Sequence, residues 1–238
     1  MKTKCILYSV MIMGCSSFAG PLVEITSTSV PVLTVANSNM VTAEGLIKIN
    51  LEAVRDYEKH PERWRNFELL GVARGYLSEA KYDQAIPLYR KFLTVQPTNT
   101  VAMRELGICY VYAKKYEEAA STFKQGWRLG DDRLLLSLAN TYSVEAHFSD
   151  IKPLVPDLLK ARSRSTDSDY KHEIANVLII YSLNGASPPD KKVFLETIHG
   201  LSDEFILERK DTAQAVILGL KTFGYQDQAD QLSTKMTK

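Results

Sequence analysis

Two consecutive stretches of 34 residues decide the fold of this chain: NFELLGVARGYLSEAKYDQAIPLYRKFLTVQPTN at 66–99 and TVAMRELGICYVYAKKYEEAASTFKQGWRLGDDR at 100–133. Aligned without a gap, they place small and aromatic residues at matching positions. The matching pairs are Val72-Ala73 with Leu106-Gly107, Tyr76 with Tyr110, Ala85 with Ala119, and Tyr89 with Phe123. A fixed period of this length predicts a repeat protein, in which one copy cannot bury its apolar face alone and stacked neighbours share a core.

The period and the matched residues resemble the tetratricopeptide-repeat (TPR) family. The resemblance implies an all-α fold, a TPR-type α-solenoid of antiparallel helix pairs with divergent C-terminal helices. Small Ala73 and Gly107 on the first helix of each pair would let Ala85 and Ala119 of the second helix approach closely. Pro97 stands at the closing turn, where the family has proline.

Helical pattern extends on both sides of the two clear copies. An apolar stripe predicts an N-terminal helix over 43–58, and a degenerate third copy follows at 132–165, with Leu138-Ala139 and Tyr142 at the matching places. The third copy is out of register by about two residues. Because proline removes a backbone N–H, Pro153 predicts a late start of its second helix and Pro156 a kink.

The remainder, 166–238, keeps a helical pattern but loses the repeat signature, so we interpret it as a divergent TPR-like part. Helices are expected over 170–183, 190–199 and 203–209, followed by a divergent pair between 211 and 238 that turns at Gly224-Tyr225. The N-terminal helix and the three copies together form the expected domain at 42–165.

The first nineteen residues have the features of a secretory signal peptide. Lys2 and Lys4 precede the short apolar run CILYSVMIM and a series of small residues. Two processing routes are open: cleavage after Ala19, or a lipoprotein signal ending at residue 14 with lipidation of Cys15. A Ser-, Thr- and Pro-rich segment at 20–41 is expected to be an extended tether. We therefore expect export to the periplasm, or anchoring in the outer membrane as a lipoprotein.

The charges of the chain nearly cancel, with 29 basic and 28 acidic residues, so no large field points to nucleic acid. The four histidines lie far apart, without metal-ligand spacing, and no phosphate-binding or nucleophile motif is present. We therefore expect no metal site, no cofactor and no enzymatic activity. Cys109 is expected to be a buried apolar residue, and Asp131-Asp132 a solvated turn or helix cap.

The TPR resemblance implies that the first helix of each pair lines a groove that binds another protein. The ligand-facing positions of the family correspond to Phe67, Leu70, Arg74, Leu77, Val101, Arg104, Ile108, Tyr112, Arg133 and Asn140. The remaining positions of the three copies are Ser78, Val111, Leu136, Ser143 and Val144. These residues favour a peptide or helix with apolar anchors and an acidic group. Alternatively, the N-terminal helix or the tether fills the groove.

Together these features predict a non-catalytic scaffold or assembly factor of the bacterial cell envelope, with roles in pilus or secretion-system assembly. The chain resembles the pilotins of type IV pili and the TPR lipoproteins of tight-adherence pili only in architecture and in expected cellular location. A periplasmic adaptor for cell-wall enzymes and a secretion chaperone are the alternatives.

Overall fold

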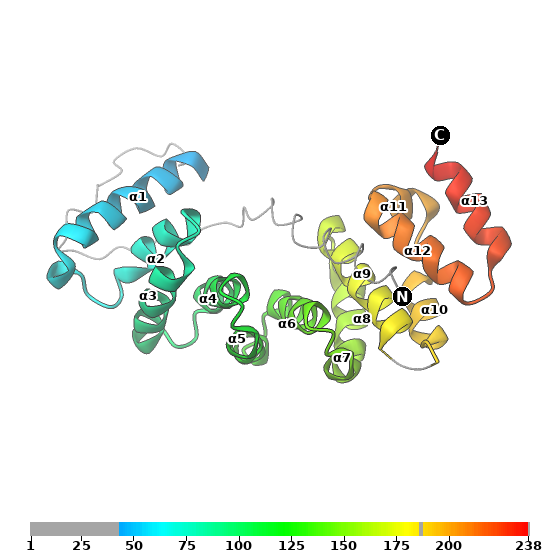
Figure 1. Ribbon diagram of the computed structural model, residues 1–238, viewed down its shortest axis with the longest axis horizontal. Helices are drawn as coiled ribbons and strands as arrows, with labels where there is room; N and C mark the ends of the chain where they lie inside the picture. Colours follow the sequence, from blue (N-terminus) through cyan, green and yellow to red (C-terminus); the bar gives the residue numbers. More distant parts are fainter. Residues whose placement is uncertain (1–42, 186–187, 238) are drawn as a thin grey trace. The chain divides into compact units, whose positions relative to one another are not determined.

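The computed structural model describes residues 43–185 and 188–237, and every regular element within these ranges is a helix (Figure 1). The expected all-α class is confirmed, and within each part consecutive helices pack as antiparallel pairs, as in a TPR α-solenoid. Contacts divide the chain into two compact units, with the boundary between Phe92 and Leu93. The predicted signal peptide, the lipidation residue Cys15 and the 20–41 tether lie outside the described residues.

The first unit contains α1 (Ala43–Lys59), the 3-10 turn η1 (Pro61–Arg63), α2 (Leu69–Ser78) and most of α3 (Tyr82–Val95). Helix α1 packs against α2 at Gly75, where a Cβ carbon would stand 2.5 Å from the backbone oxygen of Asn50. Next to this contact the Tyr76 hydroxyl donates a hydrogen bond to Glu58 at 3.2 Å. Since the two backbones can approach this closely only without a side chain, Gly75 fixes where α1 lies on α2.

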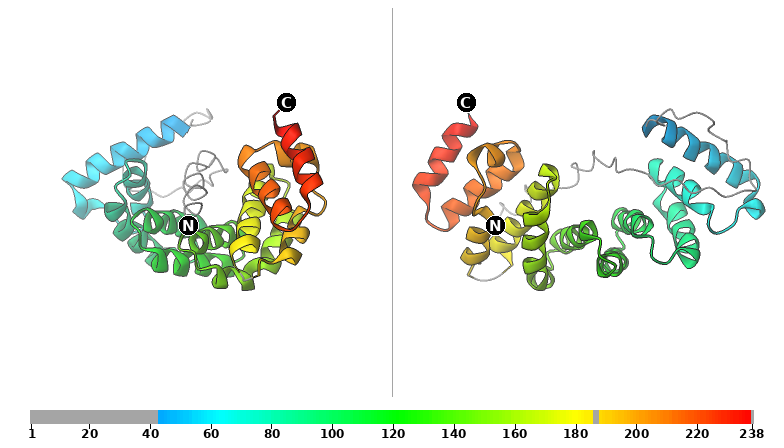
Figure 2. Two further views of the ribbon diagram at one scale, coloured as in Figure 1. Left: turned by 45° about the vertical axis from the view of Figure 1, so that its right-hand side comes forward. Right: turned by 180° about the vertical axis from the view of Figure 1, so that it is seen from behind.

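The second unit contains the other helices: α4 (Thr100–Tyr112), α5 (Tyr116–Arg128), α6 (Asp132–Val144), α7 (Phe148–Ile151), η2 (Lys152–Leu154), α8 (Val155–Arg164), α9 (Ser168–Asn184), α10 (Lys191–Ile198), α11 (Asp203–Leu207), α12 (Lys210–Thr222) and α13 (Gln226–Met236). The predicted helices are thus all present, within a few residues of their expected ends. Helices α12 and α13, orange and red in Figure 2, form the expected C-terminal pair.

Four turns between paired helices share one backbone geometry. Ala80, Lys114, Ala146 and Gly224 each have a positive φ, of 56°, 58°, 58° and 84°. The next N–H donates to a carbonyl five residues earlier in every case: Lys81 to Tyr76, Lys115 to Tyr110, His147 to Tyr142, and Tyr225 to Leu220, at 2.8–2.9 Å. This is the Schellman arrangement, which satisfies the last carbonyls of a helix. The α12–α13 pair therefore repeats the turn of the three preceding copies.

The turns also fix the register of the copies. From Ala80 to Lys114 the spacing is the full repeat length, whereas Ala146 comes two residues early. The shortened register expected for the third copy is therefore confirmed. The fourth residue of each second helix is completely buried, namely Ala85, Ala119, Ile151 and Ala229. Small or aliphatic residues are needed at this place because the first helix of the pair packs against it.

The prolines of the third copy break its second helix in two. The second helix already begins at Phe148 with α7, so the late start expected from Pro153 applies only to its longer part: Pro153 lies in η2, and α8 begins at Val155. The kink expected at Pro156 is wrong, because Pro156 lies in the first turn of α8. A proline there removes an N–H that has no partner within the helix, so it costs α8 no backbone hydrogen bond.

Candidate partner-binding site

In the first unit, the predicted partner-binding residues lie on and just before α2. Phe67 precedes the helix and is 38% exposed, while Leu70, Arg74 and Leu77 are half-buried. On the other side of the same helix Ala73 is completely buried and Tyr76 is buried. Helix α2 therefore carries apolar residues on both sides, and Phe67 is the one that is most open to a ligand.

In the second unit, α4 repeats this arrangement. Val101 and Tyr112, at the two ends of the helix, are each 40% exposed, and Arg104 and Ile108 between them are half-buried. Val101 lies at the same register as Phe67. An exposed aliphatic or aromatic residue thus recurs at the matching place of two copies. One such residue alone would need no explanation, but its recurrence is typical of a binding surface.

The third copy departs from the expected pattern. Arg133 is exposed and Asn140 is half-buried, but Leu136 and Ser143 are buried. Helix α6 packs against α4, α5, α7, α8 and α9, and these two buried side chains offer no surface to a ligand. The buried Oδ1 atom of Asn140 has no hydrogen-bond donor among the described residues.

Cys109 on α4 is completely buried, as expected from its place in an apolar helix. Burial raises the pKa of its thiol to about 12. A thiol that stays protonated at neutral pH is a poor nucleophile and a poor metal ligand. Cys109 therefore contributes to packing rather than to chemistry.

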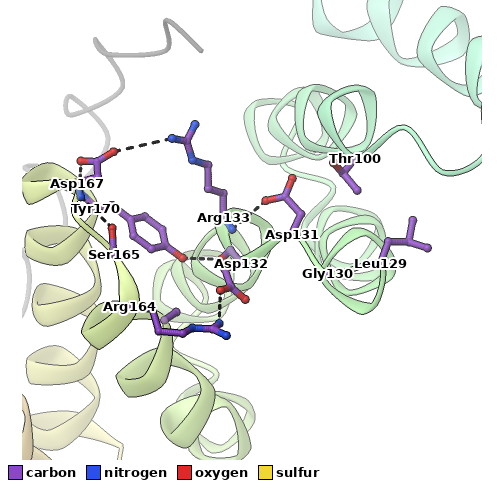
Figure 3. Close-up of a pocket in the computed structure, with 11 residues that line it drawn as sticks. Thr100, Leu129, Gly130, Asp131, Asp132, Arg133, Arg164, Ser165, Asp167 and Tyr170 are labelled. Atoms are coloured by element: carbon purple, nitrogen blue, oxygen red, sulfur yellow. Dashed lines mark hydrogen bonds and ion pairs between the residues drawn. The ribbon is translucent and has the colours of Figure 1, made fainter. Parts of the chain in front are cut away.

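A cavity of about 480 Å³ in the second unit holds Arg133, one of the predicted residues (Figure 3). Its walls come from the N-terminal ends of α4, α6 and α9 and the C-terminal ends of α5 and α8. Arg164 pairs with Asp132 at 2.5 Å, and the Tyr170 hydroxyl donates to the Asp132 carbonyl at 2.7 Å. Arg133 reaches Asp167 at 3.9 Å. The charged groups that line this cavity mainly tie α6 to α8 and α9.

The two aspartates at the start of α6, which line this cavity, have different roles. Asp131 caps the helix, since its Oδ1 accepts from the backbone N–H of Arg133 at 3.0 Å. Asp132, expected to be a solvated turn or cap residue, is instead half-buried in the pairing with Arg164. Nothing in the sequence links these two residues, which are 32 positions apart.

The described residues contain no group of three or more histidine, cysteine and acidic side chains that could hold a metal ion. Among them, no helix is both long enough and apolar enough to cross a bilayer. Of the histidines, His172 is completely buried, and its ring nitrogens lie 3.2 Å from Thr212 and from Glu208. This histidine has hydrogen-bond partners for both nitrogens and is part of the C-terminal core.

Comparison with known proteins gives a match to a family model and distant structural likenesses. No curated protein matches the chain. A solved structure described as "Structure of Naa15/Naa10 bound to HypK-THB" is 14% identical, with a TM-score of 0.32 over 81% of this chain and 34% of that one. The chain thus spans about a third of that protein. Residues 76–140 match the family model described as "Tetratricopeptide repeat", a kind of repeat that serves as a scaffold for binding other proteins.

Proposed function

We propose that this protein is a non-catalytic assembly factor of the bacterial cell envelope, and that it holds a peptide or helix of its partner against the first helices of its repeats. The observation that carries this proposal is that Phe67 in the first unit and Val101 in the second are each exposed at the same register of their own copy. Tyr112, equally exposed at the other end of α4, extends the surface.

The apolar character of these positions supports a protein segment as the ligand. The opposite side of α4 already buries Met103, Leu106 and Tyr110, so Val101 and Tyr112 are not needed for the core. Exposed apolar residues at helical spacing suit an amphipathic helix or an extended peptide that inserts apolar side chains. Arg74 and Arg104, half-buried on the same helices, add guanidinium groups that can donate hydrogen bonds to carboxylate or carbonyl groups of a partner.

The proposed location of the protein in the cell envelope depends on its first nineteen residues. Cleavage after Ala19 would release a periplasmic protein, whereas lipidation of Cys15 would tether it to the outer membrane. Mass spectrometry of the mature N-terminus in the native host distinguishes the two routes. A chain that keeps Met1 in the cytosol would contradict the envelope role and favour a secretion chaperone.

The binding surface is tested by photo-cross-linking in the native host. A photoreactive residue at Val101 should join the protein to one predominant partner, because this side chain lies on the proposed surface. The matched control carries the same residue at Gln125, which is exposed on α5, the second helix of that copy. Equal cross-linking from both positions, or none from Val101, would show that the partner does not bind at the first helices.

A further inference from the structure

Arg133 differs from the other charged residues that line the cavity at the start of α6 (Figure 3). The others are held by hydrogen bonds within the protein: Arg164 by Asp132, Asp131 by a backbone N–H of α6, and Asp167 by the backbone N–H of Tyr170 at 3.1 Å. The guanidinium of Arg133 forms no hydrogen bond with any of the described residues. Its ion pair with Asp167 spans 3.9 Å, which is longer than a hydrogen bond. The N–H donors of Arg133 are therefore available to a ligand.

The ion pair between Arg133 and Asp167 is too weak to occupy the guanidinium. Both side chains are about half exposed, at 52% and 49%, and a solvent-exposed ion pair contributes little to stability. The Oδ1 atom of Asp167 also accepts the backbone N–H that it caps at the start of α9. Because a guanidinium has several N–H donors in one plane, a second carboxylate can bind it without breaking a strong contact.

Arg133 occupies the register at which the preceding copy has the exposed Val101. Each of the two is the second residue of its copy, and both belong to the second unit, where α4 packs against α6. Thr100, which directly precedes Val101, lines the same cavity as Arg133. A segment that contacts Val101 therefore lies at the edge of this cavity.

The face that the proposed function assigns to the partner has a cationic bias. The predicted ligand-facing positions on α4 and α6 include Arg104 and Arg133 but no aspartate or glutamate. The chain as a whole is nearly balanced, with 29 basic and 28 acidic residues, so the bias belongs to this face. Because the charges of two binding surfaces tend to be complementary, the bias favours an acidic segment over a basic one.

The aspartates of the cavity are less suited to receive a cation than Arg133 is to receive a carboxylate. Asp132 is already paired with Arg164 at 2.5 Å. Asp131 and Asp167 cap α6 and α9, and the partial positive charge at the start of a helix offsets the charge of a capping carboxylate. A lysine in this cavity would also be repelled by Arg133.

We propose that the partner segment carries an aspartate or glutamate next to its apolar anchor, and that this carboxylate enters the cavity and pairs with Arg133. The guanidinium donates two parallel hydrogen bonds to the carboxylate, while the apolar anchor contacts Val101. The cavity, of about 480 Å³, has the size of sites that hold a side chain together with its backbone. The inference rests on the proposed function, because it assigns a charge and a position to the segment that the repeats bind.

The test uses two fluorescent peptides of alternating leucine and glutamine, one of which has a single glutamate in place of its central glutamine. Each is titrated into the full protein, and the glutamate peptide should bind more tightly. Arg133→Gln removes the charge without breaking a hydrogen bond of the side chain. It should weaken binding of the glutamate peptide about tenfold and leave the glutamine peptide unaffected. Lys124→Gln, which removes an exposed charge on α5, is the control for general attraction. Thermal melts confirm that each variant is folded.

A second variant tests the same pairing in the opposite direction. Asp167→Asn removes the carboxylate that faces Arg133 but keeps the cap of α9, because asparagine caps helices as well as aspartate does. This variant should bind the glutamate peptide about threefold more tightly than the parent, since the competing charge is gone. Unchanged or weaker binding would contradict the pairing of the ligand with Arg133.

Parental affinity of Arg133→Gln for the glutamate peptide would overturn the proposal, as would an equal loss in Lys124→Gln. A parent that binds neither peptide, or both equally, would also overturn it, while cross-linking at Val101 would still decide the proposed function. The same peptide with a central lysine is the third probe: tighter binding of this peptide than of the glutamate peptide would assign the cavity to a cation instead.

Discussion

Gly107 of α4 lies directly against the ring of Phe123 of α5. A Cβ carbon on Gly107 would stand 2.5 Å from Cζ and 2.7 Å from Cδ1 of that ring, and all three nearest atoms belong to Phe123. The sequence predicted a small residue here to admit Ala119 of the facing helix. The structure shows that the aromatic ring at the matched position of the pair occupies this space.

This contact predicts a loss of stability when Gly107 is enlarged. Gly107→Ala should lower the free energy of unfolding by about 1–3 kcal/mol, because the ring and both helices must shift to admit one methyl group. Gly71→Ala on α2 is the matched control, since the nearest atom to its Cβ would be 3.6 Å away. There the better helix propensity of alanine should stabilise by up to about 1 kcal/mol. Urea denaturation measures the unfolding midpoint of each variant. If Gly107→Ala had the midpoint of the parent, the close packing of Gly107 against Phe123 would be contradicted.

Apolar residues at the matched register should carry partner binding. The double variant Phe67→Ser/Val101→Ser should weaken binding of the cross-linked partner at least tenfold, if each side chain contributes about 1 kcal/mol. Val95→Ser/Leu129→Ser is the control, because these residues are each 47% exposed but lie at the ends of second helices. A binding titration beside a melting curve decides. Parental affinity in the first variant, or an equal loss in the second, would place recognition elsewhere.

Cys109 should resist thiol reagents in the folded protein. Its pKa is raised to about 12 by burial, so the reactive thiolate is scarce at neutral pH and the reagent has no access. Peptide mass spectrometry after iodoacetamide treatment should show labelling of Cys109 only when urea is added. Rapid labelling without urea would show that α4 opens locally far more often than its packing suggests.

The hydrogen bond between His172 and Glu208 should make stability depend on pH. Hydrogen bonds from His172 and Ser168 hold the pKa of Glu208 below its usual value of 4.5. A carboxyl whose pKa is lower in the folded state stabilises the fold above its unfolded pKa, and this contribution is lost as the pH falls through the folded pKa. Glu208→Gln should therefore destabilise the protein at neutral pH and have a smaller effect at about pH 3.5.

Urea denaturation of parent and Glu208→Gln at the two pH values measures this difference. Glu117→Gln, an exposed residue on α5, is the control for general loss of negative charge. A Glu208→Gln effect that is independent of pH would show that the carboxylate is not stabilised by its contacts in the folded state.

The sequence by itself determined the helices and their pairing. The 34-residue period, the small residues at Ala85 and Ala119, and the turn at Gly224-Tyr225 are local features, and each is found at the predicted place. They could be predicted because helix spacing and turn chemistry depend on residues that are close along the chain. The same logic failed at Pro156, where a proline within a helical pattern starts a helix rather than bending one.

Only the tertiary structure decided which polar residues meet. Arg164 pairs with Asp132, Asn176 with Asp211 and His172 with Glu208, over 32 to 36 positions of sequence. These sequence separations are close to one repeat length, but no residue type recurs at this spacing to indicate which residues pair. Their pairing depends on how neighbouring helices are rotated against each other, which the packing of buried side chains sets. For the same reason, only the packed helices show that the Oδ1 atom of Asn176 is buried without a hydrogen-bond donor among the described residues.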